Sequence, residues 1–124
     1  MSIGNDGSGF EYDANIAPSP ERWLALAEGD RLAVIDAFHH AENRSTGQRA
    51  SLHNGIHCIV ENQIALSNPP ATAETLARLM RDGLSRHDAI HAIGTVVTEL
   101  LTHAAGAYDE KAYVGKLQRL TADR

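Results

Sequence analysis

Four histidines of this chain form two pairs, and the two members of each pair are four positions apart. The first pair is His53 and His57, with Glu61 a further four residues along, and the second pair is His87 and His91. Residues four apart lie on one face of an α-helix at roughly 6 Å, so each pair can close on one metal ion. Four imidazoles and one carboxylate are then available to a single site.

The types of donor in this set indicate a transition metal. Imidazole is the commonest ligand of zinc and also suits iron and nickel, while a carboxylate such as Glu61 favours iron, manganese or catalytic zinc. We expect Zn²⁺ first, with Fe, Mn or Ni as alternatives, held as one enclosed ion or as two ions about 3.5–4 Å apart. Glu61 is either a fifth ligand or a catalytic residue that orients a histidine or takes a proton from bound water.

Three other histidines occupy different predicted positions. His39 lies on the core-facing side of its helix, where it is either a metal ligand from a third helix or a core histidine with ordinary hydrogen bonds. His40 is turned about 100° away from His39 and is predicted to be solvated. His103 lies about 18 Å beyond His91 along the helix axis and cannot share its ion.

The elements that must position these residues are helices. Apolar residues recur every three or four positions, strand-like alternation does not persist, and the Ser85-to-Asp88 segment has the pattern of a helix-capping box. We therefore predict an all-α fold, a compact helical bundle of about four to six helices. The predicted helices cover about residues 20–28, 31–43, 48–67, 72–82, 86–105 and 109–120.

Chain direction predicts how the two histidine pairs meet. Two helix–turn connections separate the helices that carry them, so in an up-down-up arrangement the two helices run parallel. If they are neighbours, His53 is level with His87, and His57 is level with His91. Gly94, one turn after the second pair, removes a side chain and lets another backbone or a ligand approach closely.

The chain is the size of one domain. At 124 residues it can bury a continuous core. Residues 1–18, rich in glycine and polar side chains at their start, are predicted to form a flexible N-terminal arm, and residues 19–124 a single helical domain. Phe10, Tyr12 and Ile16 are the arm residues that can pin it to the body or to a second subunit. The short chain and these side chains favour a homodimer.

Composition excludes several classes of partner. The formal charge is −5, from 11 basic and 16 acidic residues, and no run of Lys or Arg is present, so nucleic acid is not an expected partner. No window approaches the ~20 apolar residues that a membrane helix needs, so we expect no membrane partner. Cys58 is the only cysteine, which favours a reducing, cytoplasmic location. No small-molecule substrate can be inferred.

The histidine segments carry a family resemblance. The segment from His53 to Gln63 and the segment from Arg86 to Gly94 together resemble an uncharacterised family of small bacterial helical domains. In that family an HxxxHxxxE helix with a following Gln precedes a second HxxxH helix. The match covers about residues 51–120, and here Asn62 separates the Glu from the Gln. The resemblance implies a helical fold, makes the paired histidines its distinguishing positions, and implies no activity.

Hemerythrin-like bundles, which bind two irons through His and carboxylate ligands at helical spacing, are similar in type. Their fourth-helix HxxxxD element is missing here, because His103 and Asp109 are six residues apart. A di-iron redox or oxygen-binding protein is therefore a minor option.

The main functional prediction is a transition-metal-binding helical protein. If it is an enzyme, metal-assisted hydrolysis is the chemistry that the residues support most directly, because a bound ion lowers the pKa of water toward ~7. The alternative is a metal-free helical module for interaction or dimerisation.

Overall fold

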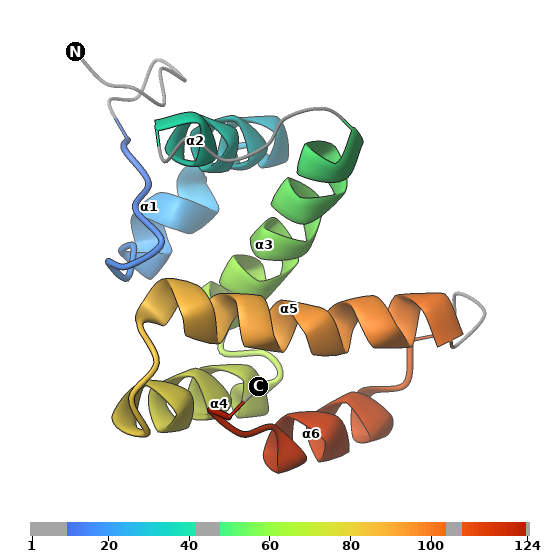
Figure 1. The fold of residues 1–124 in the computed structure, drawn as a ribbon. Helices are drawn as coiled ribbons and strands as arrows, with labels where there is room; N and C mark the ends of the chain where they lie inside the picture. Colours follow the sequence, from blue (N-terminus) through green and yellow to red (C-terminus); the bar gives the residue numbers. More distant parts are fainter. Residues whose placement is uncertain (1–9, 42–47, 104–107, 124) are drawn as a thin grey trace.

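The computed structural model describes residues 10–41, 48–103 and 108–123, which form six α-helices and no strand (Figure 1). The all-α prediction is confirmed. Within these ranges no helix is long and apolar enough to cross a membrane. The helices are α1 (Pro20–Ala25), α2 (Glu28–Ala41), α3 (Gln48–Leu66), α4 (Pro70–Arg81), α5 (Arg86–His103) and α6 (Glu110–Arg119).

Local side-chain chemistry sets several helix ends. Ser19 caps α1 by accepting a hydrogen bond from Arg22 N, and Asp109 caps α6 in the same way. Ser85 Oγ accepts from the backbone of Asp88, as the capping-box pattern predicts. After α4 the chain turns at Gly83, whose φ of 116° is readily adopted only by glycine.

Helix α3 packs against α1 and α2 and also against α4 and α5, and it contributes to two hydrophobic clusters. The larger cluster joins the buried face of α3 at Val60 to α4, α5 and α6, with Leu79, Ile93 and Leu117 fully buried. The smaller cluster joins Cys58 of α3 to α1, α2 and the segment before them. Side chains of α3 that lie between the two clusters therefore sit where α2 and α5 both approach.

The segment that precedes α1 packs against the body of the molecule. Phe10 and Tyr12 are 5% and 6% exposed, and their rings lie 5.9 and 5.6 Å from the ring of Trp23. Residues 10–14 of the predicted arm are therefore pinned to the body, the possibility that Phe10 and Tyr12 offered, because apolar side chains at alternate positions repay the entropy of ordering them. Ile16 is 65% exposed and does not pin the segment. Residues 1–9 of the predicted arm lie outside the described residues.

Helices α3 and α5 cross instead of running side by side in parallel (Figure 1). The ring of His53 lies 4.7 Å from that of His91, and the ring of His57 lies 5.6 Å from those of both His87 and His91. The predicted parallel register is therefore wrong, because side-chain packing at the contact, and not the number of turns, sets the crossing angle. Near the crossing, a Cβ added to Gly94 would lie 3.0 Å from Ile56 Cγ2, so the close neighbour is a side chain.

Candidate metal centre

Five histidine rings from three helices meet between the two clusters. His39 comes from α2, His53 and His57 come from α3, and His87 and His91 come from α5. Ring centroids of neighbouring members lie 4.3–6.5 Å apart, the shortest distance being that between His87 and His91. The prediction that imidazoles of separate chain segments converge is confirmed.

Four of these histidines have the geometry of a ligand set. One nitrogen of each of His39, His57, His87 and His91 lies within 4.8 Å of the others. Tetrahedral zinc with bonds of 2.0–2.1 Å holds its nitrogens about 3.3–3.4 Å apart, so small side-chain movements would close this set on an ion. The first three histidines are buried, and His91 is half-buried.

No family model, curated protein or solved structure matches this chain. The hydrogen bonds around the cluster indicate which ring nitrogens of His39 and His57 carry a hydrogen.

The contacts of His39 define its tautomer. Its Nδ1 lies 2.7 Å from Asn54 Oδ1, and Asn54 Nδ2 donates to Asp36 Oδ1 at 2.8 Å. Because the Asp36 carboxylate accepts and the amide nitrogen faces it, Asn54 presents its oxygen to His39. His39 Nδ1 must then carry the hydrogen. In the neutral form of the ring the lone pair is therefore on Nε2, a buried atom.

A second chain of hydrogen bonds defines the tautomer of His57. The Tyr12 hydroxyl donates to Glu61 Oε2 at 2.5 Å, so its oxygen accepts from His57 Nδ1 at 3.1 Å. His57 therefore has its lone pair on Nε2. That atom is buried and makes no hydrogen bond within the described part of the chain. Buried polar atoms are rarely left in this state, and a metal ion would satisfy it.

Arg86 holds the far end of this chain of hydrogen bonds. Its guanidinium donates to both oxygens of Glu61 at 2.8 and 2.9 Å and to the carbonyl of Ala14 at 3.0 Å. The Arg86 and Glu61 side chains are only 3% and 1% exposed. The carboxylate is thus held by a buried two-point ion pair and by the hydroxyl of Tyr12.

The protonation of the site suits metal binding. Burial first, and then the neighbouring histidines, lower the pKa of His57 from 6.5 to about 2, so its imidazole is neutral. Burial and then the charge of Glu61 raise the pKa of Tyr12 well above 10, so the phenol keeps its proton. Burial acts to lower the pKa of Arg86, but the hydrogen bond and charge of Glu61 outweigh it and raise that pKa overall.

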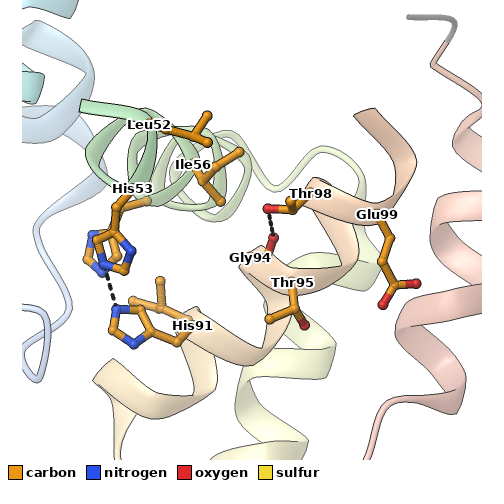
Figure 2. Close-up of a pocket in the computed structure, with 10 residues that line it drawn as sticks. Leu52, His53, Ile56, His91, Gly94, Thr95, Thr98 and Glu99 are labelled. Carbon is orange, nitrogen blue, oxygen red and sulfur yellow. Dashed lines mark hydrogen bonds between the residues drawn. The ribbon is translucent and has the colours of Figure 1, made fainter. Parts of the chain in front are cut away.

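Two residues predicted as ligands lie outside the set of four. His53 is exposed, and its Nε2 is hydrogen-bonded to His91 Nε2 at 3.1 Å (Figure 2). Glu61 contacts Arg86 and Tyr12, and the Tyr12 hydroxyl in turn contacts His57. His39, which the sequence leaves open between ligand and core residue, is one of the four.

Sequence reasoning did not assign the outer residues Tyr12, Asn54 and Arg86 to the site. Arg86 directly precedes His87, and Asn54 lies one turn before Cys58 on α3, but neither spacing identifies a partner on another segment. Tyr12 was predicted only as a packing residue. The signal for Tyr12 in the sequence was an aromatic residue with a hydroxyl group in an otherwise polar segment.

Proposed function

We propose that this protein binds one transition metal ion through His39, His57, His87 and His91. The observation that carries the proposal is the approach of four imidazole nitrogens to within 4.8 Å of one another, three of the residues being buried. The tautomers of His39 and His57 support it, because each has its Nδ1–H engaged by an outer partner and its Nε2 lone pair in the cluster.

The donor set favours zinc. Four neutral imidazoles match tetrahedral Zn²⁺ and also suit Ni²⁺ and Fe²⁺, whereas Mn²⁺ prefers oxygen ligands. A di-iron role would call on carboxylate ligands, and Glu61 is instead engaged with Arg86. We therefore propose a single zinc ion in the resting protein.

Elemental analysis of protein purified without a histidine tag tests this proposal. We expect about one equivalent of zinc, and a chelator competition titration should give the affinity. His39→Ala should weaken zinc binding by more than the roughly 10- to 100-fold that loss of an outer partner costs. His40→Ala is the matched control, because His40 is the next residue on α2 and its side chain is 55% exposed beside Asp36.

The contrary result is equally clear. If the untagged protein contains no transition metal, takes up none on titration, and the two alanine variants behave alike, the metal centre is excluded. The alternative from the sequence, a metal-free helical interaction module, would then account better for the fold.

Metal-assisted hydrolysis, predicted from the sequence for an enzyme, requires more than a bound ion. A structural zinc site is closed by four ligands, whereas a catalytic zinc keeps a position for water or substrate. The two roles therefore differ in whether an external molecule can reach the ion.

A further inference from the structure

A groove between α3 and α5 reaches the histidine cluster from outside (Figure 2). It has a volume of about 680 Å³, within the range of small-molecule sites. One end contains His53, His57 and His91, and the lining continues along α5 to Glu99. His57 and His91 of the set of four thus border the groove together with the exposed His53, and of these two ligands only His91 is half-buried.

Beyond the histidines this groove is apolar in character. Leu52, Ile56 and Ile90 line it, and Gly94 adds no side chain. The hydroxyls of Thr95 and Thr98 donate to carbonyls of their own helix at 2.6 and 2.9 Å. A ligand lying along the groove would therefore find few unused donors.

The far end of the groove carries a paired charge. Glu99 Oε2 lies 3.6 Å from Lys116 Nζ of α6. From His91 to Glu99 the groove follows α5 for about 12 Å at 1.5 Å per residue. Its shape suits an extended chain, with metal-binding groups at one end.

We propose that this groove binds a molecule with a medium-length aliphatic chain and an oxygen head group that coordinates the ion. This inference rests on the proposed metal site. The chain lies along Leu52, Ile56 and Thr95, and the head group enters beside His91. Structural zinc sites are closed by four ligands, whereas catalytic zinc sites can expand to five, so this binding requires the ion held by four imidazoles to accept the head group as a fifth ligand.

Two hydroxamates bound to the Co²⁺-loaded protein provide the test. Octanohydroxamate and acetohydroxamate carry the same head group, and visible absorption of the cobalt reports its coordination. Full burial of one methylene favours binding about fourfold. If each of six further methylenes gains half of that free energy in the open groove, octanohydroxamate binds on the order of 50-fold more tightly.

A matched pair of variants locates the chain. Thr95→Trp places a large side chain in the groove, and Thr102→Trp places it at an exposed position of the same helix outside the groove. Both threonine hydroxyls donate to carbonyls of α5. We expect Thr95→Trp to remove most of the preference for octanohydroxamate and Thr102→Trp to preserve it, with cobalt affinity unchanged in both.

The outcomes separate this proposal from the metal site itself. Cobalt binding with equal affinity for the two hydroxamates, or a chain-length preference that Thr95→Trp leaves intact, overturns the groove proposal and leaves the metal site standing. Failure of the protein to bind Co²⁺ or Zn²⁺ overturns both.

Discussion

At the scale of single residues, the site depends on which nitrogen of each imidazole carries the hydrogen. His39 and His57 each donate from Nδ1 to an oxygen that can only accept in that position, Asn54 Oδ1 in one case and the Tyr12 hydroxyl oxygen in the other. Both rings thereby turn an Nε2 lone pair toward the cluster. Such outer partners fix ring orientation and raise the basicity of a ligand.

Tyr12→Phe isolates the contribution of one hydroxyl. The phenyl ring keeps its packing beside Trp23 and Phe38, while His57 loses the acceptor of its Nδ1–H. We expect zinc affinity to fall about 10- to 100-fold in a chelator competition titration. Tyr108→Phe is the control, because Tyr108 is 57% exposed. Equal affinities in the two variants would show that the Tyr12 hydroxyl does not position His57.

At the scale of the helices, one buried ion pair joins three segments. Arg86 in the first turn of α5 binds Glu61 of α3 and the carbonyl of Ala14, and the backbone of His87 donates to Asn15 Oδ1 at 3.1 Å. The N-terminal segment is therefore part of the framework that sets the start of α5. That start carries His87, one of the four clustered histidines, so the segment is connected to the candidate metal centre.

Arg86→Met tests this connection. It leaves the Glu61 carboxylate buried without its cation, so we expect the free energy of unfolding to fall by about 3–5 kcal/mol in denaturant titration. Lys116→Met is the matched control, because it breaks the Lys116–Glu99 pair, whose side chains are 39% and 42% exposed. Exposed pairs contribute about 0–1 kcal/mol. Similar losses in the two variants would contradict the structural role of the buried pair.

At the scale of the whole molecule, the burial of His57 in its neutral form makes stability depend on pH. The pKa of His57 is about 2 in the folded chain and 6.5 in the unfolded chain. Its contribution is therefore fully present above pH 6.5 and is lost as the pH falls toward 2, because only the unfolded chain takes up the proton.

Denaturant titrations of the metal-free protein in chelator should show this dependence. Between pH 6.5 and 5 we expect His57 alone to lower the free energy of unfolding by about 1.7 kcal/mol, because the slope rises from about 0.7 kcal/mol per pH unit at pH 6.5 to about 1.4 kcal/mol per pH unit at lower pH. His57→Gln should remove that part of the slope, and His40→Gln should keep it. A slope that is the same in both variants would mean that His57 is already protonated in the folded chain near pH 5.

The packing of residues 10–14 also bears on assembly. Phe10 and Tyr12, which prompted the prediction of a homodimer, are buried within the subunit. They no longer support that prediction, and the homodimer and the cytoplasmic location remain predictions.

Much of this architecture follows from local pattern. Spacing of apolar residues, prolines and capping residues predicted six helical segments close to those observed, and the four-residue spacing correctly placed His53 beside His57 and His87 beside His91 on their helices. These features depend on residues within one or two helical turns of each other, so they can be predicted from the sequence.

Contacts between distant segments follow from no such pattern. The crossing of α3 over α5, the placement of His39 in the set of four and of His53 outside it, and the pairing of Arg86 with Glu61 each depend on how all the helices pack together. Helical periodicity defines which side chains share a face, but it does not determine which helix packs against that face or at what crossing angle. The spacing of the histidines therefore predicted a metal site. The packing of three helices decided which imidazole nitrogens lie close enough together to hold an ion.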